Sequence, residues 1–341
     1  MPEVVVLSRA GARSLPQDLA AHIQQNARLR FVTRHDAPDH GESVRLLGSA
    51  TVLATTNVTL PRLDHALLRA CPHLRHVVLY ATGYEHVDLE TLDAHGVTLS
   101  VLPEYATTAV AEHALGLLLG LATRSHLAND RSRGFVPHET SLRGLELAGR
   151  TLGIIGVGRI GTDLARIAVG LGMEVVGCDT SPRARLDAQQ RGIPMTSSPD
   201  LLERADVIAL CCSTRLDAPP VIGAQELART RPGGLVVNIG RPALVDHDAV
   251  AGAIRSGYLR GYAVDDTVFD PGNDLVIEGR VLQTGHSAWW RDEVLERGAA
   301  HFGRAVLAAV HGSPVDLVTG RPGRPGEPVQ PDRVTATGRV A

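Results

Sequence analysis

Three side chains that could carry acid–base chemistry follow predicted strands in the second half of the chain. Arg241 comes directly after the apolar run LVVNIG, Asp265 ends the run RGYAVD, and His286 follows VLQTG. Parallel strands end at the same edge of a sheet, and α/β proteins bind ligands at that edge. A guanidinium there can stabilise negative charge on an oxygen, and an imidazole can donate or accept a proton. The pattern therefore predicts a site that polarises a carbonyl group and protonates its oxygen.

A glycine-rich turn precedes these residues and predicts a dinucleotide site. The segment reads Gly156-Val157-Gly158-Arg159-Ile160-Gly161, between the apolar run TLGII and the helical pattern RIGTDLARIAVG. In a G-x-G-x-x-G turn the first glycine permits the tight turn and the second lets a pyrophosphate approach the backbone. The third allows the helix to pack closely on the strand. The amide groups that open the helix then face the negative charge.

An acidic residue follows this turn at a suitable spacing. Asp179 ends the next predicted strand, 18 residues after Gly161. A carboxylate at that point hydrogen-bonds ribose hydroxyls and repels a 2′-phosphate, which favours NAD over NADP. Arg183 and Arg185 lie nearby and could weaken that preference. The alternative, a glycine-rich turn that holds no ligand, does not explain why strand, helix and acid occur together.

Short apolar strands and helical segments alternate along most of the chain, which indicates parallel βαβ units. We expect a Rossmann-like, doubly wound parallel sheet and a second α/β unit of flavodoxin-like type. The stretch 107–124 is apolar on most faces and predicts a buried helix. The expected strands cover 3–8, 50–56, 74–80, 97–103, 151–156, 173–179, 206–212, 235–239, 260–265 and 281–285.

Composition excludes several classes of protein. The 341 residues carry a formal net charge of -3, so no strong basic field favours nucleic acid or an anionic membrane. The sequence contains no lysine, which excludes a lysine Schiff base and a Walker P-loop. The four cysteines form no CxxC pair and lie at no metal-ligand spacing, so we expect no metal site. We also expect no transmembrane helix and a cytoplasmic location.

Long stretches resemble the D-isomer-specific 2-hydroxyacid dehydrogenase family. Segment 147–179 is similar to that family's cofactor signature, and segment 231–265 to its arginine segment. Segment 80–124 is similar to its substrate loop and crossing helix, and the resemblance extends from Val52 to about Gly320. It implies an NAD-dependent enzyme that interconverts a D-2-hydroxy acid and a 2-oxo acid, and it implies a homodimer.

The resemblance implies a role for each matching residue. Arg241 corresponds to the arginine that holds the substrate carboxylate and carbonyl, and His286 to the acid–base residue. Asp270, five residues after Asp265, corresponds to the acid that pairs with this histidine, and Asp265 to the residue that orients the nicotinamide carboxamide. The loop that grips the substrate carboxylate corresponds to Ala81, Thr82 and Gly83.

Four positions depart from the family pattern. Asp270 stands where the family usually has Glu, and it is one methylene shorter. Pro242 replaces a glycine, Gly285 replaces a proline, and Ala106 stands where asparagine is frequent. The acid at position 270 argues against a formate dehydrogenase, which has Gln there in the family pattern.

The same resemblance implies a discontinuous domain organisation. We expect residues 1–102 with 289–320 to form the substrate-binding domain, residues 103–288 the NAD-binding domain, and 321–341 a disordered tail. Two alternatives stay open at this point. One is a non-enzymatic NAD(H)-sensing scaffold of the corepressor type, and the other is an enzyme with an unusual substrate, such as a phosphonate or a specialised metabolite.

Overall fold

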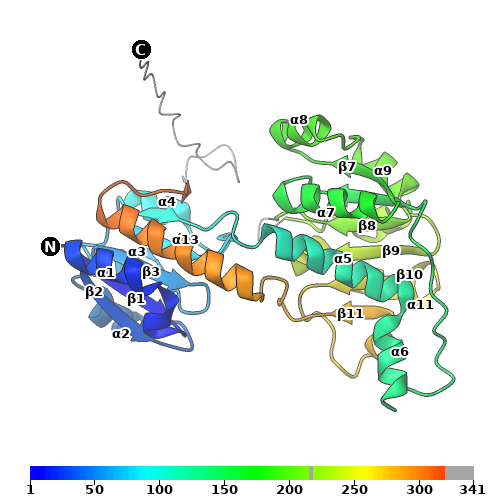
Figure 1. Cartoon of the computed structure of the whole chain (residues 1–341), viewed down its shortest axis with the longest axis horizontal. Coiled ribbons are helices and arrows are strands. Elements are labelled where there is room, and N and C mark those ends of the chain that lie inside the picture. The colour runs from blue at the N-terminus through cyan, green and yellow to red at the C-terminus, as the bar shows by residue number, and fades with distance from the viewer. Residues whose placement is uncertain (215–217, 319–341) are drawn as a thin grey trace. The chain divides into compact units, whose positions relative to one another are not determined.

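The computed structural model describes residues 1–214 and 218–318, which form two compact units (Figure 1). Among the described residues, unit 1 consists of Met1–Tyr105 together with 292–318, and unit 2 is Ala106–Arg291. The tail that was predicted to be disordered, 321–341, lies outside the described residues. Among the described residues, no helix combines the length and the hydropathy that crossing a membrane requires.

Unit 1 is built on a six-stranded sheet in the order β12-β5-β4-β3-β1-β2. Strands β1 to β5 are parallel, and their order β2-β1-β3-β4-β5 is that of flavodoxin-like folds, as predicted. The strands are β1 (Glu3–Ser8), β2 (Arg28–Thr33), β3 (Val52–Thr56), β4 (His76–Tyr80), β5 (Thr98–Ser100) and the antiparallel β12 (Leu317–Val318). The helices are α1 (Gln17–Asn26), α2 (His40–Leu47), α3 (His65–Ala70), α4 (Leu89–Ala94) and α13 (Asp292–Val310).

The last helix, α13, completes unit 1 although it is distant in sequence. It packs against α1 and β4. The ring of Tyr80 contacts the rings of Tyr105 and Phe302 edge-on, at centroid distances of 5.3 and 5.2 Å. Gly298 makes this approach possible, because a Cβ there would overlap the Tyr80 side chain. Close packing of α13 on β4 therefore depends on a residue without a side chain.

A buried histidine links the sheet of unit 1 to the C-terminal segment. His76 is 4% exposed, its Nδ1 lies 2.6 Å from Thr98 Oγ1, and its Nε2 lies 3.0 Å from Ser100 Oγ. Ser100 donates its hydroxyl to the carbonyl of Val315, so it accepts from Nε2–H and leaves Nδ1 as an acceptor. Burial lowers the pKa of His76 to about 4, because removal of the ring from water disfavours its charged form.

We expect this histidine to make unit 1 sensitive to acid. The pKa in the folded state lies below the unfolded value, so the unfolded chain binds the proton more readily and stability is lost as pH falls from 6.5 towards 4. Between pH 7 and pH 5, His76 should account for a loss of about 2 kcal/mol. Urea unfolding of the wild type and of His76→Gln at both pH values measures this difference. Equal losses in the two proteins would contradict the assignment.

Unit 2 contains the second six-stranded sheet, in the order β11-β10-β9-β8-β6-β7, with all strands parallel. Residues Gly177 and Met195 form an additional parallel bridge at the β7 edge. If that bridge is counted as a strand reduced to one residue pair, the order is that of the Rossmann fold, as predicted. The strands are β6 (Thr151–Ile155), β7 (Glu174–Cys178), β8 (Val207–Leu210), β9 (Gly234–Asn238), β10 (Leu259–Val264) and β11 (Val281–Gln283).

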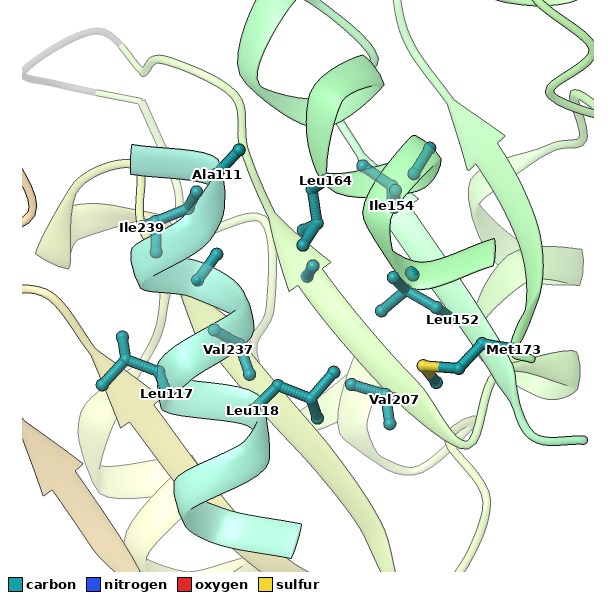
Figure 2. Close-up of a cluster of buried hydrophobic side chains, with 14 of the residues drawn as sticks. Ala111, Leu117, Leu118, Leu152, Ile154, Leu164, Met173, Val207, Val237 and Ile239 are labelled. Atoms are coloured by element: carbon teal, nitrogen blue, oxygen red, sulfur yellow. The ribbon is translucent and has the colours of Figure 1, made fainter. Parts of the chain in front are cut away.

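The long apolar helix α5 (Thr107–Thr123) covers one face of this sheet. It packs against α7 (Arg159–Gly170) and over β9 and β10 (Figure 1). Figure 2 shows Leu117 and Leu118 of α5 among side chains from β6, β8, β9 and α7. The other helices of unit 2 are α6 (Ser125–Ser132), α8 (Pro182–Gln190), α9 (Ser198–Arg204), α10 (Ala224–Leu227), α11 (His247–Arg255) and α12 (Asp274–Ile277).

Candidate active site

The glycine turn lies between β6 and α7, at the point where the strand order of the sheet reverses. Gly156 has a φ of +94°, and a Cβ there would come within 2.6 Å of Cys212 N. A Cβ on Gly161 would overlap the carbonyl oxygen of Gly156. At Gly158, in contrast, a Cβ would meet no atom within 4 Å in the part of the chain that the structure describes. Two glycines are thus required by the fold, and the third faces open space, as the predicted approach of a pyrophosphate would need.

Asp179 lies beside this turn, at the end of β7. Its Oδ2 accepts a hydrogen bond of 2.9 Å from the N–H of Val157, and its Oδ1 accepts one of 2.8 Å from the N–H of Ser181. The carboxylate is therefore held half-buried next to the glycine turn. Its predicted hydrogen bond to a ribose hydroxyl stays a prediction.

The different roles of the glycines can be separated by mutation. We expect Gly158→Ala to weaken NADH binding at least tenfold while costing less than about 1 kcal/mol of stability, because the new methyl group enters only the ligand's space. Gly161→Ala should instead destabilise unit 2 by about 1–3 kcal/mol through overlap with the backbone. Fluorescence titration with NADH and urea unfolding measure the two effects. Unchanged NADH affinity in Gly158→Ala would show that no phosphate approaches this backbone.

Arg241 follows β9 in a turn that is built by a buried asparagine. Asn238 is 1% exposed, and its Nδ2 donates to the carbonyl of Arg241 at 2.8 Å. Its Oδ1 accepts from the N–H of Gly240 at 3.0 Å. Pro242 opens the short 3-10 helix Pro242–Leu244, a position that needs no N–H donor, so the departure from glycine is accommodated. Asn238 is thus a positioning residue for Arg241, which sequence reasoning had placed only at a strand end.

Asp265 follows β10 and binds the segment that carries His286. It is 9% exposed, and its Oδ1 accepts hydrogen bonds of 2.8 Å from Thr284 Oγ1 and from Ser287 N. Its Oδ2 accepts one of 3.1 Å from Ala288 N. The carboxylate therefore fixes the backbone that follows His286 and the Thr284 side chain that precedes it. Its predicted role towards a nicotinamide carboxamide stays a prediction.

His113, on α5, extends this network. Its Nε2 lies 2.9 Å from Thr284 Oγ1 and 3.6 Å from Asp265 Oδ1, and its Nδ1 lies 3.1 Å from Arg291 Nη2. Burial lowers the pKa of His113, and this outweighs the attraction of Asp265. Sequence analysis did not assign His113 to the site. No spacing signal could have done so, because it lies more than 150 positions from its partners.

His286 itself is half-exposed and has an unusual backbone. Its φ is +60°, in the left-handed region, and the preceding Gly285 has a φ of +62°. The carboxylate beside its ring is Asp266, with Oδ2 3.8 Å from Nδ1. Asp270 is exposed and begins a turn in which Asn273 N donates to its carbonyl. Within residues 1–214 and 218–318, the structure records no hydrogen bond or ion pair between the Asp270 side chain and His286.

Arg241, Asp265 and His286 come from neighbouring strands. β9, β10 and β11 are adjacent and parallel, and each of the three residues lies just beyond the carboxyl end of one of them. The structure thus brings the three segments to one sheet edge, the edge at which the glycine turn also lies. Among the residues described, no group of three or more His, Cys, Asp or Glu side chains could hold a metal ion.

The predicted carboxylate loop belongs to unit 1, where it follows β4. Ala81 is buried, and its carbonyl accepts a 2.8 Å hydrogen bond from Leu102 N. Thr82 Oγ1 donates to the carbonyl of Leu102, also at 2.8 Å. In the described part of the chain no acceptor is recorded for the N–H groups of Thr82 and Gly83. These two donors could therefore bind an anion.

Comparison with known proteins tests the resemblance. Residues 115–288 match the family described as D-isomer specific 2-hydroxyacid dehydrogenase, NAD binding domain. The chain is 31% identical to D-3-phosphoglycerate dehydrogenase of Mycobacterium leprae over 303 residues, which cover 88% of this chain and 56% of that protein. It is 30% identical to D-lactate dehydrogenase of Escherichia coli, over 65% of this chain and 72% of the relative. The chain therefore spans about half the length of the first of these curated relatives.

The solved structures agree with the fold. The TT0316 protein from Thermus thermophilus superimposes with a TM-score of 0.79 at 27% identity, over 93% of this chain and 100% of that one. The family, the two-part α/β fold and the NAD cofactor that the sequence predicted are thus confirmed. Residues 115–288 match the NAD-binding domain of the D-isomer specific 2-hydroxyacid dehydrogenase family, and the chain belongs to that family.

Proposed function

We propose that this chain is an NAD-dependent oxidoreductase that interconverts a D-2-hydroxy acid and the corresponding 2-oxo acid. The observation that carries the proposal is the alignment of Arg241, Asp265 and His286 beyond three adjacent parallel strands, in the same sheet as an open glycine turn. We further propose that unit 2 binds NAD and that unit 1 binds the substrate. Asp179 supports NAD rather than NADP, through the ribose hydroxyls.

In the reducing direction, the chain's own residues provide charge stabilisation and a proton. When bound, NADH supplies the hydride that reduces the carbonyl carbon. The guanidinium of Arg241 binds the substrate carboxylate and carbonyl oxygen, and it stabilises the negative charge that develops on that oxygen. The N–H groups of Thr82 and Gly83, with the backbone of Ala81, bind the carboxylate.

His286 then donates its proton to the developing alkoxide, and in the oxidising direction it removes the hydroxyl proton. Asp265 holds the backbone that follows the ring through Ser287 and Ala288. A neighbouring carboxylate stabilises the protonated imidazole. Asp270 occupies the family position for that acid, whereas the structure records Asp266 nearest to the ring.

We propose an unphosphorylated substrate. Tyr80, Tyr84 and His86 surround the carboxylate loop in the sequence, and none of them is a permanent cation. A phosphorylated acid such as that of D-3-phosphoglycerate dehydrogenase, the name of one relative, would call for basic side chains there. The relatives named D-lactate dehydrogenase and hydroxypyruvate reductase support small unphosphorylated acids as the first substrates to test.

Steady-state oxidation of NADH tests the function. The full chain is mixed with NADH and with pyruvate, hydroxypyruvate, glyoxylate or 3-phosphohydroxypyruvate, and absorbance is followed. We expect turnover with at least one unphosphorylated acid. Tight NADH binding without turnover on any acid would favour the scaffold alternative, and turnover confined to other compounds would favour an unusual substrate.

We also propose a cytoplasmic homodimer that binds neither nucleic acid nor membrane. The helix α5 supports the dimer, because its exposed side includes Glu112 and Gly116 beside the half-buried Leu115 and Leu119. Sedimentation equilibrium of the full chain tests the oligomeric state. A monomer at micromolar concentration would contradict this part of the proposal.

A further inference from the structure

We propose that Asp266, and not Asp270, is the carboxylate that positions and charges His286 in this protein. The inference rests on the proposed function, because it assigns a partner to the proton donor of that reaction. Asp266 would act through His286 and would not touch the substrate, so it is a positioning residue. No site expectation from the sequence included it.

The geometry places one oxygen of Asp266 towards the ring and anchors the other. Oδ2 lies 3.8 Å from His286 Nδ1, at ion-pair distance and longer than a hydrogen bond. Oδ1 accepts a 2.8 Å hydrogen bond from Thr267 N, which fixes the carboxylate on its own backbone. Catalytic contacts of this kind are often long in structures without ligand and shorten when substrate binds.

The backbone before His286 explains why the ring lies near position 266. Gly285 and His286 both adopt left-handed conformations, with φ of +62° and +60°. A proline at position 285, which the family pattern prefers, is restricted to a φ near -65° and could not take this path. The nearest atom to a Cβ on Gly285 is Thr267 Oγ1 at 3.5 Å, so the turn passes directly beside the segment that follows β10. The glycine at 285 and the acid at 266 are therefore parts of one local arrangement.

The other neighbours of Asp266 leave its charge available. The charge of Asp266 also acts on His247 of α11 and on Tyr262 of β10. Burial lowers the pKa of His247 and raises the pKa of Tyr262, so both are neutral near pH 7. The imidazole of His286 is the ion-pair partner that the structure records for Asp266.

Asp270 is placed less favourably for this role. Its side chain is exposed, and its carbonyl is engaged in the turn to Asn273. The aspartate at this position is also one methylene shorter than the glutamate of the family pattern. The shorter side chain at 270 and the additional acid at 266 together indicate that the carboxylate function has moved along the chain.

Histidine NMR of the full chain tests the pair without relying on turnover. The ring signal of His286 is assigned by its loss in His286→Asn, and the pH at which it changes is measured in the wild type, Asp266→Asn and Asp270→Asn. We expect Asp266→Asn to change that pH, because the substitution removes the negative charge beside the ring. Asp270→Asn, the matched control, should leave it in place, and Asp266→Glu should restore it. A shift in Asp270→Asn with none in Asp266→Asn would overturn the inference.

A second test of the Asp266–His286 pair measures the rate at which NADH reduces the best 2-oxo acid substrate. Reduction needs protonated His286, so the alkaline limb of the pH profile of kcat/KM should move to lower pH in Asp266→Asn and stay in place in Asp270→Asn. If the wild type reduces no acid, the proposed function fails, and the NMR titration still decides which carboxylate pairs with His286. Asp266→Asn is expected to keep the NADH affinity of the wild type. A loss of NADH affinity would show that the variant is misfolded.

Discussion

Replacing His286 by asparagine should lower kcat for NADH-dependent reduction of a 2-oxo acid by roughly 10²–10⁴-fold, the usual contribution of a positioned proton donor. Asparagine suits the test because it tolerates the left-handed backbone at this position, where φ is +60°. The variant should therefore fold as the wild type does and lack only the titrating ring. Steady-state absorbance assays of NADH oxidation at several pH values measure kcat, and they would also show that the alkaline limb of its pH profile is lost.

The NADH affinity of this variant should stay within about twofold, since the glycine turn and Asp179 are untouched. His22→Gln, at an exposed position of α1, is the matched control and should retain full activity. If His286→Asn keeps more than a third of the wild-type kcat, another group donates the proton and the mechanism is wrong.

Replacing Arg241 by glutamine should reduce kcat/KM by about 150-fold, which corresponds to roughly 3 kcal/mol of lost transition-state stabilisation by analogy with removal of one oxyanion donor. Glutamine keeps a polar side chain at position 241, in the turn that Asn238 holds, and it removes the positive charge. Arg241→Lys should recover part of the loss, because an ammonium restores charge and lacks the bidentate fork of the guanidinium.

Arg204→Gln, at the exposed end of α9, provides the comparison for a general effect of lost positive charge and should leave kcat/KM unchanged. The stability of Arg241→Gln should stay close to that of the wild type, because the turn is held by Asn238 through backbone atoms. A loss below threefold in kcat/KM would remove Arg241 from the proposed mechanism.

The sequence predicted the elements that carry strong apolar patterns. Strands such as Val207–Leu210 and Gly234–Asn238 are buried throughout, so their composition alone identifies them. The edge strand Arg28–Thr33 was missed, because its sequence RLRFVT mixes charged and apolar residues and it is only half-buried. The bridge at Met195 was also missed, because a single residue pair has no periodicity in the sequence.

By itself the sequence determined the fold class, the family, the dinucleotide turn and the three strand ends that bear Arg241, Asp265 and His286. These features depend on local composition and on the rule that parallel strands end together. Only the tertiary structure decided which side chains become neighbours. The contact of Asp265 with His113 depends on α5 packing over β10, and the proximity of Asp266 to His286 depends on a left-handed turn at Gly285. Neither contact can be inferred from sequence spacing. Whether two side chains come within a few ångströms of each other depends on the direction of the backbone and on packing between segments that are distant in sequence.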